Sequence, residues 1–179
     1  YQKIYVANSI LEGMDKAQNI SEANRSRIIA ETLTVRSLLF FYLQRIYGDI
    51  PYPLTTNYMF NQTIAKTLSN EVLEKIAVDL EEAVAMLNDT YRNAERIFIN
   101  RKTAQLILAK VYMEQKRYSQ AETILKTIIE SPLYQFQNDI TKVFQKSGNH
   151  IIWQLKPRNS NDATKEASLY YFVNAAPTN

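Results

Sequence analysis

Apolar residues recur at three- and four-residue steps along most of residues 1–130, which is the period of amphipathic helices. The clearest pattern covers residues 101–132, where two such stripes are separated by a short polar turn. Small residues, Ala109 and Ala121, stand where the two helices must approach closely, and bulky residues surround them: Leu108, Tyr112, Leu125 and Ile128. Because this spacing is similar to that of the tetratricopeptide repeat, it predicts a helical hairpin.

The same period predicts three helices before this hairpin, over residues 1–18, 22–47 and 69–87. The second is apolar on nearly all sides, which is typical of a helix enclosed by its neighbours. Ser21 is suited to cap the start of this helix. Gly48 is suited to end it, because glycine adopts a positive φ at little cost.

Capping residues also predict where the helices of the hairpin begin. Asn100 stands just before the first of them and can accept a hydrogen bond from its first turn. Ser119 and Glu122 have the S-x-x-E spacing of a capping box, which predicts the start of the second helix.

A long segment without helical period, residues 51–68, follows the second helix. Pro51 and Pro53 prevent the helix from continuing into it. The segment is rich in Thr and Asn and carries several aromatic residues. Loops of this length in a compact domain are typically functional or pack over a neighbour.

The remainder, residues 131–179, is predicted to be irregular, with one short strand at residues 151–155 (IIWQL). The predicted fold is therefore mainly α, with stacked tetratricopeptide-like hairpins in residues 1–130. We expect residues 1–179 to form a single helical domain that is part of a longer chain.

The composition excludes several kinds of site. The chain has no cysteine and one histidine, His150, so thiolate sites and multi-histidine metal sites are excluded. Its three glycines, Gly13, Gly48 and Gly148, lie too far apart to form a phosphate-binding loop. The net charge of +3 is mild, and basic and acidic residues are interspersed. We therefore expect no cofactor, no metal and no nucleic-acid partner.

Hydrolytic chemistry is also disfavoured. A glycoside hydrolase needs two carboxylates that face each other across a cleft. The acidic residues of the predicted loops, Asp49, Asp139 and Asp162, have no partner at a recognisable spacing. Glu81 and Glu82 are adjacent on a predicted helix and point in different directions. We predict that the protein is not an enzyme and has no catalytic residues.

Five stretches follow one another in a distinctive order. They are an Ala7-Asn8 pair in the first helix, Arg36 before an aromatic run that ends in a Tyr-Gly-Asp-x-Pro turn, an Asp79-Leu80 pair, the hairpin, and Phe144 before IIWQL. In this order they resemble the SusD/RagB family of nutrient-binding lipoproteins from the Bacteroidetes outer membrane. The resemblance covers residues 1–155 and implies a SusD-like fold.

The resemblance implies a non-catalytic role in polysaccharide utilization. A SusD-like lipoprotein lies at the cell surface of the outer membrane, captures an oligosaccharide and delivers it to a SusC-like TonB-dependent transporter. The longest apolar run of this chain has six residues, whereas a spanning helix needs about 20. Membrane association is therefore expected only through a lipid anchor that this chain does not carry.

A glycan site implied by this resemblance would combine aromatic faces with a few polar groups. The candidate ligand-binding residues are Tyr52, Asn57, Tyr58, Phe60 and Trp153. For two of them a structural role is the alternative. Tyr52 would pack beside Pro51 and Pro53, and Trp153 would fill the core.

An alternative function is a tetratricopeptide-like scaffold that binds a peptide or protein partner. Such a surface usually requires three or more stacked repeats. The sequence contains one complete repeat and two degenerate helix pairs.

Overall fold

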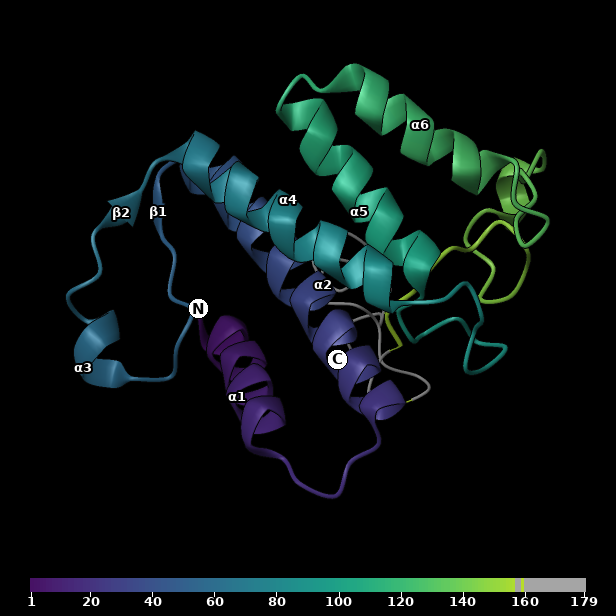
Figure 1. Cartoon of the computed structure of the whole chain (residues 1–179). Coiled ribbons are helices and arrows are strands. Elements are labelled where there is room, and N and C mark those ends of the chain that lie inside the picture. The colour runs from purple at the N-terminus through teal and green to yellow at the C-terminus, as the bar shows by residue number, and fades with distance from the viewer. Residues whose placement is uncertain (157–158, 160–179) are drawn as a thin grey trace, which may run out of the picture.

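The computed structural model describes residues 1–156 and 159, and this part of the chain is mainly helical (Figure 1). The predicted mainly α fold is therefore confirmed. The elements are α1 (Gln2–Lys16), α2 (Glu22–Tyr47), β1 (Ile50–Pro51), α3 (Tyr58–Asn61), β2 (Lys66–Thr67), α4 (Ser69–Met86), α5 (Arg101–Glu114), α6 (Tyr118–Ile129) and the 3₁₀ helix η1 (Ile140–Lys142).

Helix α2 is the centre of the molecule. It packs against α1 on one side and α4 on the other, and α5 then packs against α4 and α6 against α5 (Figure 1). Phe40 and Phe41 of α2 are fully buried, as the enclosed apolar pattern of this helix predicts. The main core lies between α2, α4 and α5, and the small residues Ala109 and Ala121 are buried in it.

Three predicted helix boundaries are confirmed. The Ser21 hydroxyl accepts a hydrogen bond from the Asn24 amide at 3.4 Å. The Asn100 side chain accepts one from the Thr103 amide at 3.0 Å. Gly48 ends α2 with a φ of +72°, a conformation that residues with a Cβ rarely adopt.

The predicted capping box is wrong. Helix α6 begins at Tyr118, and Arg117 precedes it without a side-chain cap. Arg117 fixes the start of the helix in another way. Its guanidinium lies 4.2 Å from the centre of the Tyr112 ring, and its Nε donates a hydrogen bond to Gln120.

The predicted strand at residues 151–155 is also wrong, because this segment is irregular, with a bend at Ile152, and pairs with no strand. Side chains of the segment before α5 donate hydrogen bonds to the backbone carbonyls of residues 151 and 152 instead. Arg96 donates to the carbonyl of Ile151, and the Tyr91 hydroxyl donates to that of Ile152. Beyond residue 156, only residue 159 of the predicted irregular segment lies within the described residues.

The small sheet forms elsewhere, where the two ends of the predicted loop at residues 51–68 come together. Strands β1 and β2 are antiparallel, with Ile50 opposite Thr67 and Pro51 opposite Lys66. Between them the chain leaves the body of the molecule and forms α3 (Figure 1).

A buried polar network ties this excursion to three helices. Arg36 of α2 forms an ion pair with Asp79 of α4 at 2.7 Å. The same guanidinium donates a hydrogen bond to the side-chain oxygen of Asn8 in α1 at 3.1 Å. The Asn8 amide group in turn donates to the Pro53 carbonyl at 2.9 Å. Asn8, Arg36 and Asp79 each come from a different one of the stretches that resemble the SusD/RagB family.

Within the described residues, every helix is too short or too polar to cross a membrane.

We predict that Asp79→Asn lowers the free energy of unfolding by about 3 kcal/mol, because it leaves the buried Arg36 charge without its counter-ion. Urea denaturation followed by circular dichroism measures this change. The matched control is Glu74→Gln, an exposed carboxylate on the same helix, which should alter stability by less than about 0.5 kcal/mol. Equal effects of the two substitutions would contradict the structural role of the ion pair.

Candidate functional site

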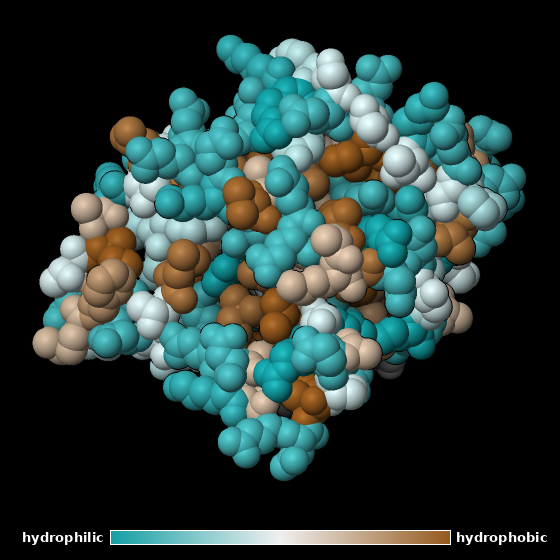
Figure 2. All heavy atoms as spheres, in the orientation of Figure 1, coloured by the Kyte–Doolittle hydropathy of each residue, from teal (hydrophilic) through white to brown (hydrophobic). Residues whose placement is uncertain are grey.

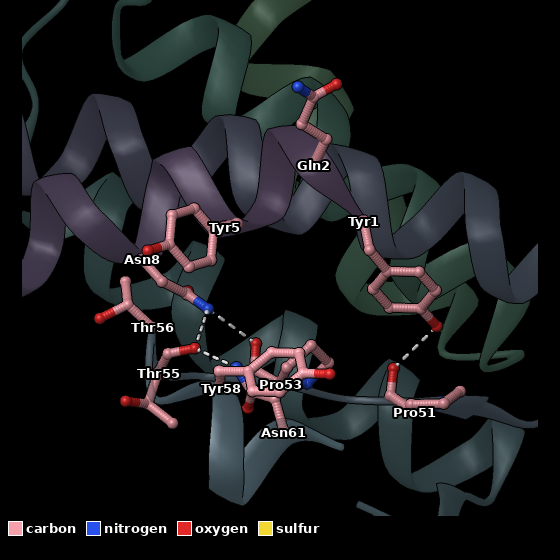
Figure 3. A pocket seen from close by; sticks show the side chains of 10 residues that line it. All are labelled: Tyr1, Gln2, Tyr5, Asn8, Pro51, Pro53, Thr55, Thr56, Tyr58 and Asn61. Carbon is pink, nitrogen blue, oxygen red and sulfur yellow. Dashed lines mark hydrogen bonds between the residues drawn. The ribbon is translucent and has the colours of Figure 1, made fainter.

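A cleft of about 390 Å³ separates α1 from the segment that follows β1 (Figure 3). This volume falls within the range of small-ligand sites, about 300–1,000 Å³. The cleft is lined by Tyr1, Gln2, Tyr5, Asn8, Pro51, Pro53, Thr55, Thr56, Tyr58 and Asn61.

Tyrosine rings and prolines form its walls. Tyr1, just before α1, and Tyr5 of α1 are 52% and 53% exposed, and Tyr58 of α3 is 73% exposed. Tyr1 and Tyr5 lie on the α1 side, with Pro53 and Tyr58 across from them (Figure 3). The cleft therefore offers open aromatic surface from two separate parts of the chain.

The Tyr1 hydroxyl closes one end of the cleft. It donates a hydrogen bond to the Pro51 carbonyl at 3.0 Å (Figure 3). Partial burial raises the pKa of this phenol, so Tyr1 stays protonated and able to donate.

Two polar residues of α1 hold the opposite wall in place. Asn8 donates to the carbonyls of Pro53 and Thr55, at 2.9 and 3.5 Å. The carboxylate of Glu12 accepts hydrogen bonds from the hydroxyls of Thr55 and Thr56, at 2.8 and 2.6 Å, and from the Thr56 amide at 2.8 Å. These bonds, above all those from Thr56, lower the pKa of Glu12.

The α1 residues of the site share one face of the helix. Tyr1, Tyr5, Asn8 and Glu12 are spaced by four, three and four residues, which places them in one line along a helix. Sequence analysis followed the neighbouring apolar stripe and missed this one. The signal that could have found it is the helical spacing of aromatic and hydrogen-bonding residues.

Three of the predicted ligand-binding residues lie together on α3. Tyr58 lines the cleft, whereas Phe60 is 58% exposed and lies outside the lining. Asn57 caps the short helix by accepting a hydrogen bond from the Phe60 amide at 3.1 Å. Apolar side chains gather at the end of the molecule that carries α3 (Figure 2).

The structure places Tyr52 and Trp153 away from this group. The Tyr52 side chain is only 7% exposed, and its ring centre lies 4.1 Å from that of Phe40. Burial raises the pKa of its phenol. Trp153 packs against the core cluster around Leu33 and Leu87, and its indole donates to the Ile97 carbonyl at 3.1 Å. Tyr52 is thus a core residue, although its recorded ring contact is with Phe40, and Trp153 is partly buried at the edge of the second core cluster. Ligand contact by either residue stays a prediction.

The side chains that line the cleft can contact a ligand through hydrogen bonds and through aromatic faces. Its lining contains amides, hydroxyls, phenols and prolines. Among residues 1–156 and 159, no group of three or more acidic, histidine or cysteine side chains could hold a metal ion.

The sequence of the chain is similar to sequences of SusD-like proteins. Residues 1–113 match a SusD-like family model described as starch-binding and associating with the outer membrane. Two SusD-like proteins of Formosa agariphila are 26% and 30% identical to the chain, over 87% and 63% of its length. The chain spans 30% and 22% of the lengths of these two relatives.

Solved structures share the fold. A laminarin-binding SusD-like protein superimposes with a TM-score of 0.73 at 23% identity, over 82% of this chain and 34% of its own. Surface glycan-binding protein A from Bacteroides uniformis gives a TM-score of 0.76 at 20% identity, over 84% of this chain and 35% of its own.

We predict that Glu12→Gln lowers the melting temperature at pH 7, because it weakens the bonds that hold residues 55 and 56. Folding lowers the pKa of the Glu12 carboxyl. Such a group stabilises the native state at pH values above its unfolded pKa, which is about 4.3 for glutamate. This stabilisation is lost as the pH falls through the lower pKa of the folded state. The difference in melting temperature between wild type and variant should therefore be full at neutral pH and shrink below about pH 4.

Differential scanning calorimetry across this pH range measures the difference. Asp15→Asn, which changes an exposed carboxylate on the same helix, is the control and should alter the melting temperature at pH 7 less than Glu12→Gln does. A difference between wild type and Glu12→Gln that stays constant with pH would contradict the role of the Glu12 carboxylate.

Proposed function

Because the chain belongs to the SusD-like family, we propose that it binds an oligosaccharide in the cleft between α1 and residues 51–61. The observation that carries the proposal is the set of exposed tyrosines, Tyr1, Tyr5 and Tyr58, around one cleft. Aromatic faces can stack on the C–H faces of sugar rings, and the amides and hydroxyls between them can bond sugar hydroxyls. Asn57, which caps α3, and Phe60 of α3 stand beside Tyr58 in the sequence, and we propose that they contribute to the same binding surface.

The known binding properties of a relative of similar fold support a glycan as the ligand. One structural neighbour binds laminarin. This neighbour is less than 25% identical to the chain, so the comparison shows a shared fold. It supports a glycan ligand only because this chain belongs to the same SusD-like family.

The proposed role is capture without catalysis. The family is described as associating with the outer membrane. We place the protein of which this chain is a part at the cell surface, as a lipoprotein that passes its oligosaccharide to a SusC-like TonB-dependent transporter. The helical body would stiffen the binding cleft and provide surface for the transporter.

The alternative of a peptide-binding scaffold is supported by one feature. An apolar hollow of about 460 Å³ follows α6 and includes Met113, Tyr118 and Ile129. A concave peptide groove usually spans at least three stacked repeats, whereas α6 packs mainly against α5 among the described helices. Glycan binding in the tyrosine-lined cleft is therefore the better-supported function.

We predict that Tyr5→Ala and Tyr58→Ala each weaken oligosaccharide binding roughly tenfold, because each removes one aromatic face worth about 1–1.5 kcal/mol. Isothermal titration with the oligosaccharide that binds best to the wild type measures the loss. Tyr118→Ala is the matched control, since this exposed tyrosine lies on α6 outside the cleft. Unchanged affinity in both cleft variants would reject this cleft as the site.

We also predict that the intact protein co-purifies from detergent-solubilised outer membranes with a TonB-dependent transporter. Affinity capture followed by mass spectrometry identifies the partner. Recovery of a soluble peptide-bearing protein in its place would favour the scaffold function.

A further inference from the structure

The lining of the tyrosine-lined cleft carries no charged side chain. Its ten residues are tyrosines, prolines, threonines, asparagines and one glutamine. The three other hollows with known linings all contain charged residues. The hollow along α6 contains Lys126, the one beside Trp153 contains Lys3, and the one at the start of α2 contains Arg27 and Arg92.

The nearest carboxylate makes the cleft still less suitable for anions. Glu12 lies directly behind Thr55 and Thr56, which line the cleft, and accepts hydrogen bonds from both. These bonds favour the ionised carboxylate. A negative charge is thus held one layer behind the wall, where it would repel an anionic group of a ligand.

The polar groups of the wall suit sugar hydroxyls. The lining offers phenol, hydroxyl and amide groups, which both donate and accept hydrogen bonds as sugar hydroxyls do. Ionised carboxylates and sulfates can only accept, so the acceptor groups of the wall give them no partner.

From these three observations we propose that the cleft selects uncharged sugar chains and excludes uronate-containing or sulfated ones. The inference rests on the proposed function and adds the chemical class of the ligand. An anionic sugar entering the cleft would lose hydration without gaining a cationic partner, which is costly. A neutral sugar exchanges its hydroxyl hydration for phenol, amide and carbonyl partners and covers the tyrosine rings. The cleft thus discriminates against an anionic sugar because the charge of that sugar would stay unpaired there.

The hollow with two arginines does not change this conclusion. Arg27 and Arg92 both form ion pairs with Glu31, at 3.4 and 3.3 Å. Arg92 also lies over the Phe98 ring, 3.6 Å from its centre. One carboxylate thus serves both guanidinium groups, and this hollow shares no lining residue with the tyrosine-lined cleft.

The test is isothermal titration of the intact protein with two sets of oligosaccharides. The neutral set comes from laminarin, starch and mannan, and the acidic set from alginate, polygalacturonate and carrageenan. The best neutral ligand is then compared with its own C6-oxidised form, which has the same linkage and differs only in its carboxylates. We expect the oxidised form to bind at least roughly tenfold more weakly, as for one unpaired charge.

Variants make the comparison specific to the cleft. Gln2→Arg places a cation at the lining and should reduce the difference between the neutral and oxidised forms. Gln18→Arg, an exposed position just beyond α1, adds the same charge outside the cleft and should leave the difference unchanged.

Each outcome is decisive. An acidic oligosaccharide that binds as tightly as the neutral ones, and loses affinity in Tyr58→Ala, would overturn the neutral class but leave glycan binding intact. If no member of either set binds, the proposed function fails together with this inference.

Discussion

The structure depends on how one buried cation is compensated. The guanidinium of Arg36 lies inside the helical body, where an unpaired charge would be strongly destabilising. Asp79 neutralises it from α4, and Asn8 accepts a hydrogen bond from it on the α1 side. Asn8 then uses its own amide group to hold the backbone at Pro53. The same network that sets the spacing of three helices therefore also sets the position of the cleft wall.

In this arrangement, the residues that hold the helices together are largely different from the residues that line the cleft. The residues that mark the family resemblance, Asn8, Arg36 and Asp79, lie mostly inside the molecule, and the latter two make no contribution to the cleft lining. The aromatic residues that line the cleft, Tyr1, Tyr5 and Tyr58, are mostly exposed and make few contacts with the core. The helical body can thus present different surface residues without changing its own packing.

Local patterns predicted the local structure well. The helices, the caps at Ser21 and Asn100 and the end of α2 at Gly48 follow from period and residue type within a few neighbouring positions. Contacts between distant residues did not follow from them. The strand expected at residues 151–155 failed because its backbone groups bond the Arg96 and Tyr91 side chains, which no local pattern reveals. Of the five predicted ligand-binding residues, Tyr58 alone lines the cleft, and ligand binding by it stays a prediction. Tyr58 stands in a visible aromatic segment, whereas Tyr1 and Tyr5 come to face the same cleft only when that segment folds back onto α1.

The pairing of β1 with β2 has an evolutionary consequence. Only two pairs of residues, Ile50 with Thr67 and Pro51 with Lys66, join the base of the excursion that carries α3. The entropic free-energy cost of closing such a loop rises slowly with its length, by about 0.6 kcal/mol for each doubling of the number of residues. Insertions and deletions at its tip are therefore cheap, since the base and the helices beneath it stay as they are. Homologues can diverge in the length of this segment more readily than anywhere in the helical body.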